Sequence, residues 1–173
     1  MKTLATFLLL VTCGTSLAQT RTVYLEANDG RRVEIGILDL AADGTYSVEM
    51  SEGSFTDHFL SMRPFKCLEG PTKNWCHIPY PYEIRRNLSE DVTDLEYDFL
   101  FVWKGATDYG INMWNGVYYR ISPDGAGYTG VLHEIDMDVL SAPPARGELR
   151  PLSAKDIHES DADSHWLPRL IIE

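Results

Sequence analysis

The sequence lacks any apolar run long enough to cross a membrane. Its main apolar run, Leu4 to Val11, is far shorter than the roughly 20 residues that a membrane-spanning helix requires. One lysine precedes this run, and the small-x-small sequence Ser16-Leu17-Ala18 follows it, which is the pattern of a cleaved export signal. We therefore expect residues 1–18 to be a signal peptide cut after Ala18, and the mature chain to be soluble and secreted or periplasmic.

Cysteine is scarce, with 3 residues in a chain of 173. Cys13 lies in the predicted signal peptide, where the segment 10–13 loosely resembles a lipoprotein signal, so its lipidation stays open. Cys67 and Cys76 remain, an even number in an exported chain, and they predict one disulfide. A zinc site is disfavoured because Cys76 and His77 are adjacent rather than spaced as metal ligands. A nucleophilic cysteine would have to stay reduced outside the cytoplasm.

Basic residues are few, with 15 Lys and Arg against 26 Asp and Glu. Such a balance repels phosphate backbones, so nucleic acid is not an expected partner. Removal of residues 1–18 leaves 155 residues, which is a common size for one domain. We expect a single β-rich domain over residues 19–173, with a proline-rich extended connector at residues 141–152.

Motifs for enzymatic chemistry are also absent. The sequence has no G-x-S-x-G elbow, no P-loop and no G-x-G-x-x-G, and His133-Glu134 lacks the second histidine of a zinc protease because Met137 stands there. We expect no cofactor and no metal site. Whether the chain is an enzyme stays open, because its five histidines could still meet acidic residues in space: His58, His77, His133, His158 and His165.

Alternating apolar residues and glycine-containing turns predict an all-β fold. Asn28-Asp29-Gly30 and Ala42-Asp43-Gly44 separate three alternating segments, which predicts a meander at the start of the domain. The segments 116–121 and 128–140 flank a glycine-rich turn and predict a long hairpin. We expect further strands over 55–65, 95–103 and, as an edge strand, 166–172, with one short helix after Ser153. The sum is an antiparallel β-sandwich or small barrel with minor helix and one disulfide.

The segment 131–139 predicts a strand with two different faces. On one face lie Glu134, Asp136 and Asp138, which we expect to be solvated, although they could hold Ca²⁺ if a loop supplied carbonyls. On the other face lies His133, which we expect to point into the core.

Aromatic residues near polar ones predict a binding surface. Tyr109 and Trp114 lie among Asp and Asn residues, and Tyr80 and Tyr82 alternate with prolines that hold the chain extended. Alternatively, such rings fill the core. We interpret the chain as an exported binding or interaction protein whose partner is a glycan, a peptide or another protein. The alternatives are a secreted hydrolase with a nonstandard His and carboxylate site, and an inhibitor or assembly factor that acts through an exposed strand edge.

Overall fold

The computed structural model describes residues 18–61 and 63–173, so the expected signal peptide and Cys13 lie outside the described residues, apart from Ala18. Within these described residues, eleven strands form one antiparallel sheet in the order β3-β2-β1-β11-β9-β8-β7-β6-β5-β4, with β10 also paired to β9. The strands are β1 (Gln19–Glu26), β2 (Arg32–Leu40), β3 (Tyr46–Met50), β4 (Thr56–Phe59), β5 (Pro64–Leu68), β6 (Lys73–His77), β7 (Phe101–Gly105), β8 (Gly116–Asp124), β9 (Gly127–Ile135), β10 (Ile157–Glu159) and β11 (Arg169–Ile172).

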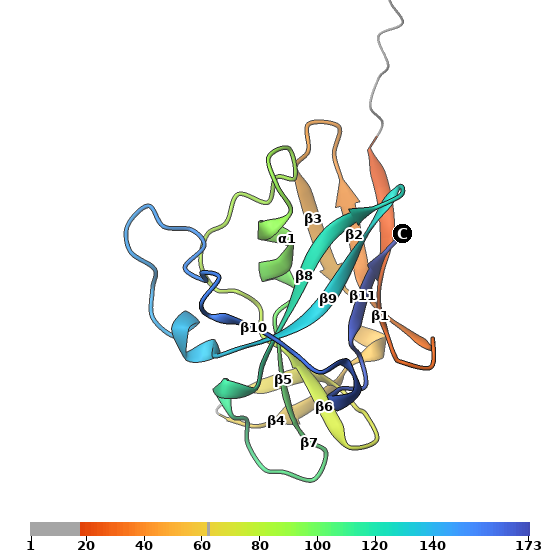
Figure 1. The fold of residues 1–173 in the computed structure, drawn as a ribbon, viewed down its shortest axis with the longest axis vertical. Helices are drawn as coiled ribbons and strands as arrows, with labels where there is room; N and C mark the ends of the chain where they lie inside the picture. Colours follow the sequence, from red (N-terminus) through yellow and green to blue (C-terminus); the bar gives the residue numbers. More distant parts are fainter. Residues whose placement is uncertain (1–17, 62) are drawn as a thin grey trace, which may run out of the picture.

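The sheet curls into half a barrel, with the helix α1 (Thr93–Asp98) beside β8 (Figure 1). Four single 3-10 turns lie between strands: η1 (Glu52–Ser54), η2 (Met113–Asn115), η3 (Met137–Leu140) and η4 (Ala162–Ser164). The predicted all-β fold with minor helix is thus confirmed, in the form of a half-barrel. Residues 141–152 contain no helix or strand.

Two glycine-containing turns determine where the first three strands end and begin. Gly30 and Gly44 have φ angles of 82° and 85°, which favour glycine because they place the backbone in the left-handed region. Each ends a tight turn between neighbouring antiparallel strands, as the sequence predicts.

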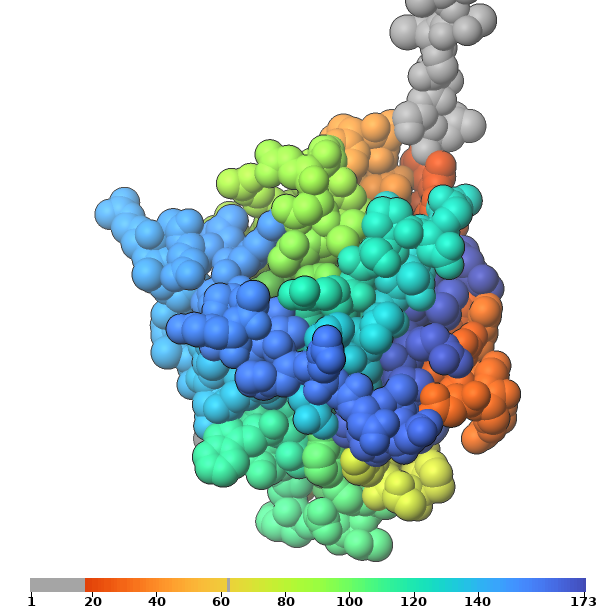
Figure 2. Space-filling model, in the orientation of Figure 1, coloured from red at the N-terminus to blue at the C-terminus, as the bar shows by residue number. Residues whose placement is uncertain are grey.

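Both faces of the middle strands are covered, because apolar residues lie on both. The inner core contains side chains from strands all around the curl, such as Leu25, Trp75 and Leu170, so it occupies the concave side. The outer core contains Tyr118, Ile135 and Met137, and the segments 78–84 and 137–157 cover it. Figure 2 shows the second of these segments, in blue, lying across the front of the molecule.

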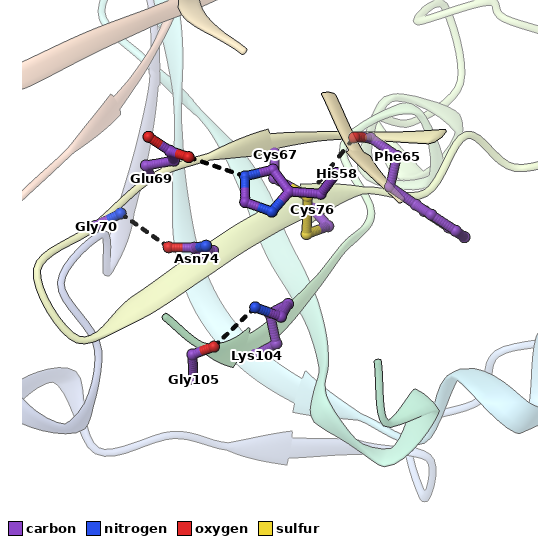
Figure 3. The surroundings of a disulfide bond; sticks show 9 residues. All are labelled: His58, Phe65, Cys67, Glu69, Gly70, Asn74, Cys76, Lys104 and Gly105. Carbon is purple, nitrogen blue, oxygen red and sulfur yellow. Dashed lines mark hydrogen bonds and ion pairs between the residues drawn. A yellow bond between two sulfur atoms is a disulfide. The ribbon is translucent and has the colours of Figure 1, made fainter. Parts of the chain in front are cut away.

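The disulfide joins the two strands of a hairpin. Cys67 on β5 lies directly opposite Cys76 on β6, and the two sulfur atoms are bonded, so the predicted disulfide is confirmed. Both residues are fully buried. Figure 3 shows Asn74, whose side-chain oxygen accepts a hydrogen bond from the Gly70 backbone N–H at 3.3 Å and so supports the turn of this hairpin. A disulfide that closes so short a loop stabilises the fold by roughly 2.5 to 3 kcal/mol in the chain-entropy model.

The predicted strand over 95–103 is wrong in its first half. Residues 93–98 form α1, and only Phe101–Gly105 form a strand. One turn of helix brings Leu95 in α1 and Phe99, which caps the end of α1, to the same side, so both reach the inner core. The alternation of apolar and acidic residues over 95–99 suits a strand as well, and it does not distinguish the two.

Three other segments also differ from expectation. Residues 55–65 form two strands rather than one, because β4 turns back onto β5 and Phe59 pairs with Pro64. The Ser153 backbone N–H and hydroxyl both donate to Asp156, as in a helix cap, yet β10 begins at Ile157 because that residue pairs with Ile135. Finally, the C-terminal strand β11 is no edge, since it lies between β1 and β9; β3 and β4 end the strand order, and β10 pairs on one side only.

The prediction that His133 points into the core is wrong, although His133 and Glu134 do lie on opposite faces of the strand, as predicted. His133 shares the outer face with Ile135, but the cover of the outer core ends before it, so it is half-buried and Val131 is exposed. Leu132, on the opposite face, lies in the inner core. The error arose because the sequence pattern does not tell which face of a strand is buried when both are partly covered.

Glu96 accepts a backbone hydrogen bond of β8 where no neighbouring strand pairs with β8. β7 pairs with β8 only at Gly116 and Val117, and α1 lies along the remainder of β8. The buried Glu96 carboxylate accepts a hydrogen bond from the Ile121 backbone N–H at 2.6 Å and another from the Tyr118 hydroxyl. Burial raises the pKa of Glu96, so the two donors are needed to stabilise its charge.

We expect Glu96→Ala to lower the free energy of unfolding by about 2 to 4 kcal/mol, because it leaves two buried donors without an acceptor. Glu90→Ala is the control, since Glu90 is exposed and pairs with the exposed Arg85; it should cost under about 0.5 kcal/mol. Urea unfolding of both variants measures the difference, and equal small costs would contradict the role given to Glu96.

Candidate functional site

The loop between β7 and β8 carries two exposed aromatic rings. Tyr109 is 93% exposed and Trp114 is 69% exposed. Trp114 lies in η2, where the Asn112 side-chain oxygen accepts a hydrogen bond from the Trp114 backbone N–H at 3.1 Å. The Trp114 indole N–H donates to Asp138 at 3.2 Å. The ring of Trp114 is thus exposed to solvent and yet fixed at its backbone and at its indole nitrogen.

The other two residues predicted to bind a ligand, Tyr80 and Tyr82, lie in a different environment. Tyr80 is 6% exposed, belongs to the outer core and packs against Tyr97 at 4.8 Å between ring centroids. Tyr82 is partly buried against the same cluster. Ile111 and Met113 of the β7–β8 loop pack on this cluster too. No hydrogen bond or ring contact joins the two pairs among the described residues.

A hydrogen-bonded relay of Lys73, His165 and Glu134 lies on the inner face, at the end of the half-barrel opposite the Gly125 turn. The His165 side chain is buried, whereas the Glu134 side chain is 44% exposed. The Lys73 ammonium donates to the Ser164 carbonyl at 2.8 Å and contacts Nδ1 of His165 at 3.3 Å. Nε2 of His165 lies 2.8 Å from a carboxylate oxygen of Glu134. Because an ammonium only donates, Nδ1 of His165 must accept, and Nε2 therefore carries the hydrogen that is donated to Glu134.

Aromatic rings enclose this relay. Lys73 lies 4.1 Å from the ring centroid of Trp103, which is a cation–π contact. The rings of Trp75 and Trp103 lie 5.2 and 5.8 Å from the His165 ring. Burial lowers the pKa of His165, and the neighbouring Lys73 ammonium lowers it further, against the opposing effect of Glu134. Burial also lowers the pKa of Lys73. The relay thus holds a neutral histidine between a cation and an anion.

The relay has the chemical groups of an acid–base catalytic site, but a substrate has no access to its histidine. The His165 side chain is 1% exposed, so a substrate cannot reach its ring in this conformation. The relay instead fastens the segment 160–168 over the inner core, where the Tyr119 hydroxyl also donates to the Leu167 carbonyl at 2.8 Å.

The remaining histidines do not join the relay through a hydrogen bond. His158 pairs in register with Glu134, and His58 contacts Glu69 at 3.0 Å. His77 contacts the Asp98 carbonyl at 3.0 Å, and burial lowers its pKa. Among residues 18–61 and 63–173, no three His, Cys, Asp or Glu side chains are grouped so that they could hold a metal ion.

Sequence reasoning considered His165 and Glu134 but did not connect them, and it missed Lys73. Residues 73 and 165 are 92 positions apart, so no spacing motif could join them. The available signal was His165 itself, which directly precedes the apolar Trp166 and Leu167 and was therefore a candidate for a buried histidine.

Comparison with protein-family models, with curated proteins and with solved structures found no match for the chain. In the described part of the chain, no helix has the length and apolar character needed to cross a membrane.

We expect His165 to make the fold sensitive to mild acid. An unfolded histidine has a pKa of about 6.5, and the folded pKa is lower, so the unfolded state binds more protons as the pH falls. The stabilising contribution is therefore complete above the unfolded pKa and is lost as the pH falls through the folded pKa. His165→Gln should reduce the loss of unfolding free energy between about pH 7 and pH 5.

Urea unfolding at several pH values measures this effect. His158→Gln is the matched control, because His158 is exposed on β10, and it should leave the pH dependence unchanged. His77 contributes in the same direction, so the loss should be reduced rather than abolished. An identical pH dependence in the wild type and in His165→Gln would contradict the assignment.

Proposed function

We propose that the chain is an exported binding protein that holds a saccharide against the exposed rings of the β7–β8 loop. The observation that carries the proposal is Trp114, whose ring is largely exposed although its backbone and its indole nitrogen are both hydrogen-bonded. Export is supported by the N-terminal sequence pattern and by the disulfide.

A fixed and exposed indole ring is suited to a flat, partly apolar ligand. Its face can cover the C–H side of a sugar ring, and its orientation is set before the ligand arrives, so little side-chain freedom is lost on binding. Asp108 and Asp138 lie in and beside the loop and can accept hydrogen bonds from hydroxyl groups. An extended peptide is the other ligand that such a surface suits, and the experiment below distinguishes the two.

The two alternatives have less support. A hydrolase would need the convergent Lys73, His165 and Glu134, but the histidine of this group is buried beneath tryptophan rings. An assembly factor would need a free strand edge, and among the strands of the described residues the free edges are the short strands β3, β4 and β10, of which β10 has only three residues. β3 is followed directly by η1, and β4 has only four residues.

We expect Trp114→Ala to weaken saccharide binding by about tenfold or more, because a central aromatic contact contributes on the order of 2 kcal/mol to such interfaces. The same substitution should lower the free energy of unfolding by under about 1 kcal/mol, because an exposed ring adds little to the core. Tyr109→Ala should act in the same way. A glycan array followed by calorimetry with the wild type and the variants measures both effects.

Phe59→Ala is the matched control, since Phe59 is 70% exposed but lies on the edge strand β4. It should change neither stability nor binding. If peptides bind but saccharides do not, and Trp114→Ala weakens peptide binding, the ligand of the β7–β8 loop is a peptide and not a saccharide. Equal binding by Trp114→Ala and the wild type would reject the loop as the binding surface.

A further inference from the structure

The outer face of the β8–β9 hairpin contains a hollow that is separate from the β7–β8 loop. Its volume is about 510 Å³. Residues of β8, β9, β10 and the segment that follows β10 line it, among them Arg120, Ser122, Val131, His133, Glu159 and Ser160. Their positions in the sheet follow from the strand register.

Opposite charges face this hollow from the two sides of β9. Arg120 on β8 pairs with Val131, and Glu159 on β10 pairs with His133, two residues further along β9. With strands about 4.8 Å apart and about 3.4 Å per residue, the Cα atoms of Arg120 and Glu159 lie roughly 12 Å apart. Val131, which is 55% exposed, provides an apolar surface between the two charges.

Arg120 forms the donor side of the hollow. Its guanidinium has no hydrogen-bond or ion-pair partner among the described residues, although acidic residues outnumber basic ones by 26 to 15. By contrast, Arg169, on the other side of Val131, is bound to Glu26 at 2.7 Å. A free guanidinium in the middle of a strand presents paired N–H donors that match a carboxylate. The Ser122 hydroxyl lies on the same face of β8 and adds a donor.

His133 and Glu159 form the acceptor side. Nδ1 of His133 lies 3.0 Å from the Val131 carbonyl, so the neutral ring donates there and leaves Nε2 as an acceptor. The Glu159 carboxylate has no side-chain partner in the described part of the chain. Together these groups can accept hydrogen bonds from an ammonium.

We propose that this hollow binds a small zwitterion, namely a free amino acid or a dipeptide, with its carboxylate on Arg120 and its ammonium on Glu159 and His133. A phosphate or a polyanion is a poorer occupant, because Glu159 and the net charge of −11 repel it. This site does not depend on saccharide binding at the β7–β8 loop, so either proposal can fail alone.

The test is an NMR titration of the ¹⁵N-labelled, disulfide-bonded protein with the dipeptide alanyl-alanine. Saturable shifts should centre on the backbone amides of Arg120, Ser122, His133 and Glu159, and residues 106–115 should be unaffected. The N-acetylated dipeptide and the dipeptide amide should each bind at least tenfold more weakly, because each lacks one of the two charges.

Two variants link each charge to its partner. Arg120→Gln should weaken binding of the dipeptide at least tenfold and remove its preference over the amide, and Glu159→Gln should remove its preference over the acetylated form. Arg146→Gln, in the connector, is the control and should bind as the wild type does. Each variant's amide spectrum reports whether it is folded. Absence of saturable shifts, equal binding of the three probes, or wild-type binding by both variants would overturn the proposal.

Discussion

A carboxylate takes the place of a strand where β7 and β8 separate, and the architecture depends on it. Beyond Val117 the backbone of β8 has no strand on that side, and a buried N–H without an acceptor would be costly. Glu96 from α1 accepts the hydrogen bond of Ile121 and also that of Tyr118. The helix is therefore required beside β8 in the half-barrel, and Leu95 of the helix and Phe99, which directly follows it, extend the inner core. The charge that makes Glu96 a strong acceptor also makes its burial unfavourable unless both donors remain in place.

With one edge of β8 held in this way, the β8–β9 hairpin is covered on both faces over only part of its length. Adjacent residues of β9 consequently lie in different environments. Glu134 faces inward and contacts His165, whose ring packs against Trp75 and Trp103, whereas His133 faces outward and lines an open hollow. The inner groups are hydrogen-bonded to one another and fasten the segment 160–168 over the inner core. The outer arrangement leaves Arg120 and Glu159 without side-chain partners among the described residues, and free charges are available for a ligand in a way that paired ones are not.

The sequence predicts those features whose cause is local. The turns at Gly30 and Gly44, the long hairpin and the disulfide follow from neighbouring residues and from the export pattern. It does not predict α1, because alternating apolar and acidic residues suit a strand as well as one helical turn. It does not place β11 between β1 and β9, because strand order depends on pairings between distant segments. The relay is hidden for the same reason: Lys73, Glu134 and His165 come from three separate segments and carry no common motif.

The charge distribution also decides between kinds of anionic ligand. With 26 acidic and 15 basic residues, the chain as a whole repels polyanions, and this repulsion acts over about a Debye length, roughly 8 Å at physiological salt. A zwitterion carries no net charge and is not excluded by this repulsion, yet its carboxylate can still bind the guanidinium at short range. An uncharged saccharide at the β7–β8 loop is likewise unaffected by it. For the two proposed sites, the net negative charge of −11 therefore favours neutral and zwitterionic ligands over polyanions.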